Sequence, residues 1–247
     1  DLNWGVPVPL EDTEGKVLYV WFEAPIGYIS STQEWAEKIG NPERWKDYWL
    51  DPETRLIHFI GKDNIIFHAL IWPAMLMGQD KTYCLPYDIP ANEFMNLEGK
   101  KISTSKNWAI WIDEFVEKFP AEYLRYYLAC IAPEKNDSDF SFSEFQQKVN
   151  RELNDVLGNL ANRVFTLINK HFDGYIKPIE LTDNSKKVLE EAQSLYRQID
   201  EGYKNYQVKW NAKLTMDLAR LGNRYFDERK PWAEIKNNPL SVQETLY

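Results

Sequence analysis

The chain has 247 residues, of which 44% are hydrophobic and 27% charged, and its formal net charge is −9. This length can hold one large domain or two ordinary ones, and the acidic balance argues against non-specific coating of nucleic acid or anionic membranes. The charge is uneven, because residues 1–150 carry 14 basic and 24 acidic side chains whereas residues 151–247 carry 15 and 14. An acidic front and a nearly neutral rear predict two parts with different partners.

Alternating apolar strands and helices are predicted in the first half. Buried strands are expected over 16–22 (KVLYVWF) and 55–61 (RLIHFIG). The first leads into a helix over 29–40, and the second runs through Gly61 into NIIFHALIWPAML, which has helical apolar spacing. Repetition of strand, tight turn and helix indicates a parallel sheet that binds ligands beyond the carboxyl ends of its strands.

Helices dominate the second half. Ser143 and Gln146 have the spacing of a capping box, which predicts the start of a long amphipathic helix that ends at Gly174. Two more long helices are predicted over 184–206 and 208–228. Antiparallel helices with short links form a bundle, so the predicted fold class is α/β followed by all-α.

The start of the chain and its cysteines indicate what kind of protein it comes from. The chain starts with DLNWGVPVPL, which lacks an initiator Met and does not have the pattern of a signal peptide. We expect the chain to be a piece of a longer protein. Cys84 and Cys130 lack metal-ligand spacing, which predicts reduced thiols in a cytoplasmic protein and no metal site. The sequence contains no run of about 18 apolar residues, so no membrane span is predicted.

Aromatic and small apolar residues surround a glycine in VWFEAPIGY. This stretch predicts either a core aromatic cluster at a turn or a pocket with aromatic walls and one phenol hydroxyl. Such a pocket would suit a soft, unbranched ligand such as a thioether. The candidate residues are Trp21, Ala24, Pro25 and Tyr28.

The stretch GKDNIIFH holds three further candidates. Gly61 would let a ligand approach the backbone, and Asp63 would either cap the next helix or accept hydrogen bonds from a ribose. His68 is expected to be a satisfied core histidine. Since His58 and His171 are the only others, neither a metal cluster nor a Ser-His-Asp triad is predicted.

Two lysines, three hydroxyl residues and a further lysine occur in EGKKISTSKNWAIW, residues 98–111. The stretch is either a solvated surface loop or a mobile loop that binds phosphate, because lysine is a flexible point charge and hydroxyls add hydrogen bonds to phosphate oxygens. The candidate donors are Lys101, Ser103, Thr104, Ser105 and Lys106.

Three residues of the second half are candidates for contact with nucleic acid. Asn159 and Arg163 are four residues apart and share a helix face, where they would either be solvated or read nucleobase edges. Trp232, after Pro231, would be either a core residue or a stacking platform for an unpaired base.

In order, the stretches YVWFEAPIGY, HFIGKDNIIFHALIWPAM, KKISTSKNWAIW, NLANR and RKPW resemble methionyl-tRNA synthetase, a class I aminoacyl-tRNA synthetase, over nearly the whole chain. The loop at 98–111 is similar to the Lys-Met-Ser-Lys-Ser loop of that family, which closes on ATP. It reads Lys-Ile-Ser-Thr-Ser here, with Thr104 at the second lysine position and Lys106 two residues later.

The resemblance implies a role for each candidate. Trp21, Ala24, Pro25, Tyr28 and His68 would line a methionine pocket; Gly61 and Asp63 would hold the ribose of ATP, Met95 would lie beside adenine, and Thr104 would belong to the ATP loop. Asn159, Arg163 and Trp232 would bind the anticodon. In the implied reaction the carboxylate of methionine attacks the α-phosphate of ATP and expels pyrophosphate, assisted by Mg²⁺. The methionyl group is then transferred to tRNA(Met), in the cytoplasm and without a membrane.

The same resemblance implies domains and a gap. Residues 1–142 would be the second half of a Rossmann-like catalytic domain, and residues 143–247 an antiparallel helical bundle that binds the anticodon. The family's His-Ile-Gly-His loop and zinc-bearing insert have no counterpart in this sequence. Zinc is therefore expected only elsewhere in a longer protein, and this chain alone is expected to be inactive. Two alternatives stay open: a non-catalytic tRNA-binding module and a class I synthetase for another apolar amino acid.

Overall fold

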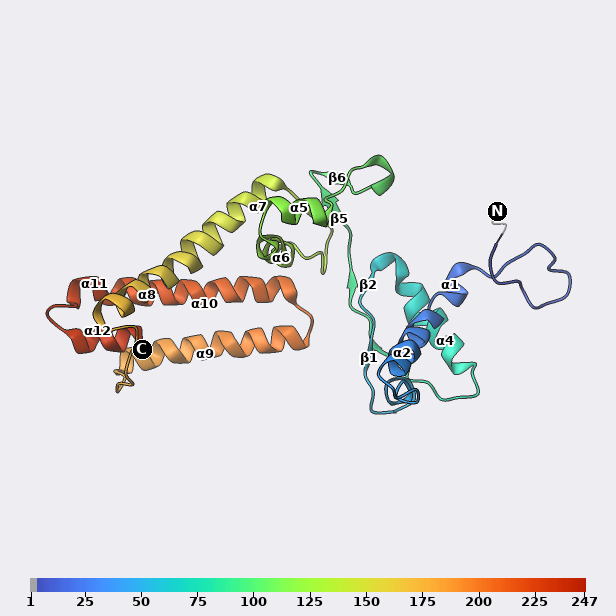
Figure 1. Cartoon of the computed structure of the whole chain (residues 1–247), viewed down its shortest axis with the longest axis horizontal. Coiled ribbons are helices and arrows are strands. Elements are labelled where there is room, and N and C mark those ends of the chain that lie inside the picture. Colours follow the sequence, from blue (N-terminus) through green and yellow to red (C-terminus); the bar gives the residue numbers. More distant parts are fainter. Residues whose placement is uncertain (1–3) are drawn as a thin grey trace. The chain divides into compact units, whose positions relative to one another are not determined.

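The computed structural model describes residues 4–247, which form two compact units. The first unit ends at Glu93 and the second comprises Phe94–Tyr247. Both combine helices with small sheets (Figure 1), so the chain has a mixed α/β structure with many helices. This division concerns packing, and the predicted boundary between functional domains after residue 142 stays a prediction.

Two short parallel strand pairs organise the first unit. β1 (Leu56–Ile57) pairs with β3 (Pro86–Asp88), and β2 (Ile60–Gly61) pairs with β4 (Ala91–Asn92). The helical segments are α1 (Val20–Glu23), α2 (Ile26–Lys38), α3 (Lys46–Trp49), η1 (Lys62–Asn64), η2 (Phe67–Ile71) and α4 (Trp72–Met77). The predicted parallel pairing and the helix after Gly61 are confirmed. The core comprises Ala36, Trp45, Trp49, Trp72 and Leu76.

The predicted strand over 16–22 is wrong. Val17 forms only an isolated antiparallel bridge with Pro7, and Val20–Glu23 is the helix α1. Tyr19 and Val20 are 66% and 54% exposed. A short apolar run fits either a strand or a helix, and within residues 4–247 no ladder of strands flanks this run to make it a strand.

A three-stranded sheet opens the second unit. β5 (Met95–Leu97) lies between β6 (Lys100–Lys101), antiparallel to it, and β7 (Ser138–Phe140), parallel to it. The helices α5 (Ile112–Lys118) and α6 (Ala121–Cys130) connect β6 to β7. The sheet and these helices share a core made of Leu97, Phe115, Leu124, Tyr127, Phe140, Phe145 and Val149.

One continuous helix follows the sheet. It consists of α7 (Phe142–Lys148), a π-helical stretch η4 (Val149–Gly158) and α8 (Asn159–His171), and Gly174 beyond it has a φ of 78°. The predicted capping box is wrong, because Ser141 is the N-cap residue and Ser143 lies inside α7. The backbone N–H of Phe142 instead donates to Glu98 Oε1 at 2.8 Å. A carboxylate from the turn between β5 and β6 thus takes the place of the local cap.

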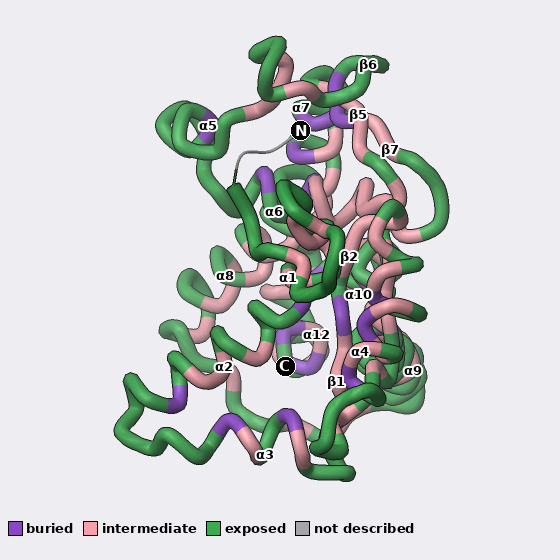
Figure 2. Tube along the Cα trace, turned by 90° about the vertical axis from the view of Figure 1, so that its right-hand side faces the viewer, coloured by how far each residue is buried: buried purple, intermediate pink, exposed green. Residues whose placement is uncertain are grey.

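The two long helices predicted over 184–206 and 208–228 are confirmed. α9 (Asp183–Lys204) and α10 (Val208–Arg229) run antiparallel as a hairpin (Figure 1), followed by α11 (Pro231–Glu234) and α12 (Pro239–Leu246). Buried positions recur among exposed ones along α10, as expected of an amphipathic helix. Figure 2 colours the chain by burial. Within residues 4–247, no helix is both long and apolar enough to cross a membrane.

Candidate functional site

Rings from α1, α2 and η2 gather in the first unit. The indole of Trp21 stacks on Phe67 at 5.1 Å between ring centroids and meets the imidazole of His68 edge-on at 6.0 Å. The hydroxyl of Tyr28 lies 2.9 Å from His68 Nε2. The structure therefore brings together three of the residues expected to line the methionine pocket.

The hydrogen bonds of His68 fix its tautomer. Its Nδ1 lies 2.9 Å from the backbone carbonyl oxygen of Asn64, which can only accept, so Nδ1 carries the proton. Nε2 then accepts a hydrogen bond from the hydroxyl of Tyr28. His68 is 1% exposed and both its nitrogens are satisfied, which confirms the expected core histidine. In this arrangement the hydroxyl proton of Tyr28 is engaged.

A second imidazole, which the sequence analysis left without a role, lies against these residues. The ring of His58 is 5.1 Å from that of Tyr28 and 5.1 Å from that of His68, and its side chain is buried. Burial, followed by the proximity of His68, lowers the pKa of His58. Its Nε2 has no hydrogen-bond partner within residues 4–247. The sequence does offer a signal for its role, because His58 directly follows β1 and precedes His68 by ten residues.

The turn before α2 places two further candidates. Pro25 is the N-cap residue of α2 and is fully buried. Ala24 is exposed, and its carbonyl oxygen accepts a hydrogen bond from the N–H of Gly27 at 3.1 Å. The turn is thus closed by its own backbone, which leaves the Ala24 methyl group at the surface beside Trp21.

Gly61 and Asp63 lie where β2 passes into η1. A side chain at Gly61 would place its Cβ 2.7 Å from Asp63 Oδ1, so the carboxylate points back toward the glycine. Asp63 is exposed, lies inside η1 and makes no capping hydrogen bond there. The helix-capping alternative is therefore wrong, and the carboxylate oxygens face a strand end that carries no side chain.

The lysine-rich loop has an anchored base. Ser103 and Trp108 exchange two backbone hydrogen bonds of 2.9 Å, and the indole N–H of Trp108 donates to the carbonyl oxygen of Leu97 at 3.1 Å. Asn107 turns the chain with a φ of 51°, in the left-handed region. The base of the loop is therefore fixed to the core of the second unit, whereas its tip is not.

The tip of this loop presents its polar groups to solvent. Lys101, Thr104, Ser105 and Lys106 are exposed, and Ser103 Oγ lies 3.2 Å from Ser105 Oγ. Among the ion pairs of the described residues, none involves Lys101 or Lys106. Met95, in β5 of the same unit, is half-buried and packs against the core. The loop therefore offers two ammonium groups and several hydroxyls to an anion.

Arg163 and Trp232 meet over a buried phenylalanine. The guanidinium carbon of Arg163 lies 4.5 Å from the ring centroid of Phe226 and 5.0 Å from that of Trp232, and the two rings are 5.7 Å apart. Arg163 Nη2 also donates to Asp227 Oδ1 at 2.5 Å. Trp232 is 47% exposed and Phe226 is buried, so the indole has a supported face and a free edge.

Asn159 lies one helical turn before Arg163. It is exposed, and its position four residues earlier puts it on the same face of the helix. The sequence thus predicts the face, but it misses Phe226 and Asp227, which support and orient Arg163. No cluster of three or more metal-binding side chains occurs in the part of the chain that the structure describes.

Comparison with known proteins gives the family. The model of "tRNA synthetases class I (M)" matches residues 1–165. The chain belongs to this family. The methionine–tRNA ligases of Pyrococcus abyssi and Flavobacterium johnsoniae are 53% and 49% identical to it over its whole length. The chain spans 36% and 35% of those two proteins.

A solved structure has a similar fold. The methionyl-tRNA synthetase of Mycobacterium tuberculosis, bound by methionyl-adenylate, matches with a TM-score of 0.81 at 27% identity. That match covers 100% of this chain and 47% of the other. The resemblance expected from the five sequence stretches is confirmed, and the mixed α/β structure with small parallel sheets agrees with this family member.

Proposed function

We propose that the full-length protein to which this chain belongs activates methionine with ATP and transfers it to tRNA(Met), in the cytoplasm and without a membrane. The observation that carries this proposal is the ring cluster of Trp21, Tyr28 and His68, found in a chain of this family. The curated relatives are methionine–tRNA ligases, and the solved relative binds methionyl-adenylate.

The ring cluster suits the side chain of methionine. The proton of the Tyr28 hydroxyl goes to His68, so this hydroxyl turns no hydrogen-bond donor toward a ligand. A thioether needs none, because its sulfur is only a weak acceptor and gains most from contact with aromatic rings. Trp21 would supply the ring face, and Ala24 and Pro25 the adjoining apolar wall.

The lysine-rich loop and the end of β2 would serve ATP. The methionine carboxylate attacks the α-phosphate and pyrophosphate leaves, so the protein must orient the groups and stabilise charge, with Mg²⁺ accompanying ATP as substrate. Gly61 and Asp63 would hold the ribose, and Met95 would lie beside adenine. Thr104 cannot neutralise a phosphate, so we assign that role to Lys101 and Lys106, aided by the hydroxyls of the loop.

The helical part would bind tRNA. We assign residues 1–142 to the second half of a Rossmann-like catalytic domain and residues 143–247 to an anticodon-binding bundle. Trp232 would stack on an unpaired base of the anticodon CAU, while Asn159 and Arg163 hydrogen-bond its edges. Asp227 holds one guanidinium nitrogen of Arg163, which leaves other N–H groups for acceptors on cytosine. Any zinc would belong to the remainder of the full-length protein.

The proposal is tested with the full-length protein. Methionine-dependent exchange of pyrophosphate into ATP and aminoacylation of a tRNA with the anticodon CAU are expected, whereas the present chain alone should support neither. Exchange that depends on another apolar amino acid would instead indicate a different class I synthetase. Binding of tRNA without any exchange would indicate a non-catalytic module.

Single substitutions identify the lysine that acts on ATP. In the full-length protein, Lys106→Ala should lower the rate of adenylation by ~100-fold, as expected for loss of part of an electrostatic site, and should leave methionine binding unchanged. A silent Lys106→Ala together with an inactive Lys101→Ala would show that Lys106 does not compensate for Thr104.

A further inference from the structure

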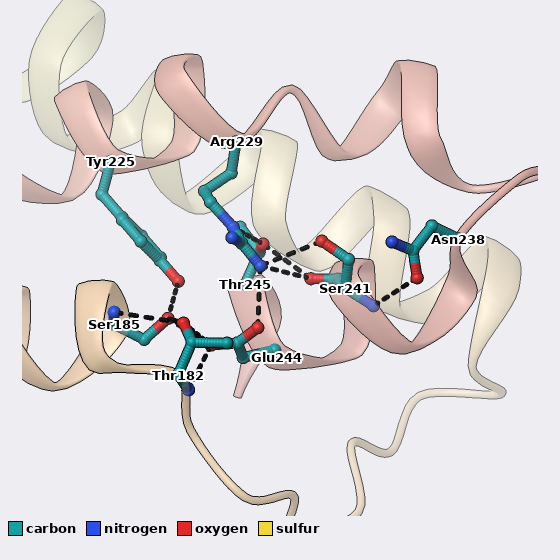
Figure 3. Close-up of polar contacts among 8 residues, drawn as sticks. All are labelled: Thr182, Ser185, Tyr225, Arg229, Asn238, Ser241, Glu244 and Thr245. Carbon is teal, nitrogen blue, oxygen red and sulfur yellow. Dashed lines mark hydrogen bonds and ion pairs between the residues drawn. The ribbon is translucent and has the colours of Figure 1, made fainter.

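Glu244 of α12 is the centre of a buried polar network (Figure 3). Its side chain lies in the interior, 7% exposed, and accepts hydrogen bonds from the N–H of Thr182 at 2.8 Å and from Thr182 Oγ1 at 2.6 Å. Arg229 Nη2 donates to it at 2.8 Å, and the hydroxyl of Ser185 donates as well. One carboxylate therefore joins the start of α9, the end of α10 and α12.

Arg229 contributes the second half of the network. It is the last residue of α10, and it also donates from Nε to Thr245 Oγ1 at 3.1 Å and from Nη2 to Ser241 Oγ at 2.9 Å. Burial raises the pKa of Glu244, but the hydrogen bonds from Ser185 and Thr182 and the charge of Arg229 together outweigh burial and lower it to about 2. Glu244 is therefore ionised at neutral pH.

The network lies next to the residues that hold Trp232 in place. After Arg229 the chain turns at Lys230, with a φ of 45°, and passes through the fully buried Pro231 to Trp232. In addition, α12 inserts apolar side chains into the core that contains Phe226, the ring beneath Arg163 and Trp232. These apolar side chains are Val242 and Leu246.

We propose that Glu244 and Arg229 are positioning residues for anticodon recognition, which hold Arg163, Phe226 and Trp232 as a preformed stacking platform. This inference rests on the proposed function. A platform that is already ordered does not lose conformational entropy when a base binds, so its affinity is higher than that of a loose one. A charged pair with several hydrogen-bonding partners suits this task because it permits few alternative arrangements.

The chain offers a matched control for the test. Arg224 of α10 donates to Glu191 of α9 at 2.8 Å and 3.0 Å, but this pair is 56% and 53% exposed. It links two of the same helices without a contact to the platform. The variants Glu244→Gln and Glu191→Gln, made in the full-length protein, therefore differ in whether the removed charge supports Trp232.

The measured quantity is the Kd of an anticodon stem-loop RNA that carries CAU, compared with one altered at the first anticodon base. Glu244→Gln should weaken binding of the CAU stem-loop by about tenfold, a part of what one stacked base contributes, and should reduce discrimination between the two RNAs. Glu191→Gln should change either Kd by less than about twofold, as for an exposed pair. Adenylation, which needs no tRNA, should be equal in all variants.

The outcomes separate positioning from general stability. A folded Glu244→Gln protein that binds and discriminates like the unmodified protein would overturn the inference, even if it unfolds at a lower temperature. Should Glu244→Gln not fold, Arg229→Lys, which retains the charge but loses the planar fork, is judged by the same comparison. An unmodified protein that fails to discriminate the two RNAs would overturn the proposed function itself, and the inference with it.

Discussion

Two buried clusters, one in each unit, bond their polar groups in different ways. In the first, each nitrogen of His68 has one partner, and His58 beside it keeps an unpaired Nε2. In the second, Glu244 is ionised and receives four donors, one of them the charged group of Arg229. A cluster with few hydrogen bonds is held mainly by the packing of its rings, whereas a charged cluster with many hydrogen bonds is held by directional polar contacts.

Truncation of the first ring cluster should give the largest effect. In the full-length protein, Trp21→Ala should lose about 3 kcal/mol or more of interaction with methionine, by analogy with other truncations of large aromatic side chains. The KM for methionine should therefore rise by about 100-fold or more, while binding of tRNA is unchanged. A folded variant with an unchanged KM would show that the cluster only stabilises the fold.

Truncation in the second unit should give the reciprocal result. Stacking on one base contributes ~1–3 kcal/mol, so Trp232→Ala should weaken aminoacylation by about 10- to 100-fold. Adenylation should be spared. The measurement compares tRNA with the anticodon CAU and tRNA altered at its first base. Equal loss of both activities, or undiminished discrimination, would mean that Trp232 is only a core residue.

Two helical glycines sharpen the comparison of packing. A Cβ at Gly202 of α9 would lie 2.1 Å from Oδ1 of the fully buried Asn211 of α10, whereas a Cβ at Gly27 of α2 meets nothing within 4 Å. Gly202→Ala should therefore lower the free energy of unfolding by about 1–3 kcal/mol. Gly27→Ala should raise it by ~0.5–1 kcal/mol, since alanine favours a helix. Urea unfolding measures both, and equal effects would contradict the close approach.

Acid should affect the two clusters in sequence. The pKa of His58 is lowered on folding, so the unfolded chain binds more protons and the first unit loses stability as pH falls below about 6.5. The pKa of Glu244 is lowered to about 2, so its contribution is lost only as pH falls from about 4.5 toward 2. Hydrogen exchange at a series of pH values should show the first unit opening first.

Variants that remove each titrating group supply the control. His58→Gln should abolish the loss of protection near pH 6 in the first unit, and Glu244→Gln should lower protection of α12 at neutral pH and flatten its dependence below pH 4.5. Simultaneous opening of both units in the unmodified protein would contradict the contrast between the two clusters.

The sequence predicts long periodic elements and clustered residue types better than contacts between distant segments. The helices over 142–171, 183–204 and 208–229 follow from apolar spacing, and two members of the ring cluster, Trp21 and Tyr28, stand together in VWFEAPIGY. The partners that complete each feature could not be read in this way. Glu98 caps a residue 44 positions away, and Thr182 meets Glu244 across 62 positions.

The candidate site shows the same limit. Arg163 and Trp232 were predicted from their chemistry. Phe226, which contacts both, could not be, because in the sequence it is one of many apolar residues of an amphipathic helix. The segment 16–22 failed for a related reason, because whether an apolar run becomes a strand depends on which strands lie beside it.

The helix over 142–171 also sets a rotational phase. Phe145 and Val149 near its start pack into the core beside the sheet, whereas Leu160 and Val164 pack into the core around Phe226. Each residue of an α-helix advances the side-chain direction by about 100°, and each residue of a π-helix by somewhat less. One residue removed from the π-helical stretch 149–158 would therefore turn Arg163 by most of that angle about the axis. The number of residues in this stretch, more than their identity, therefore decides which way the Arg163 side chain faces.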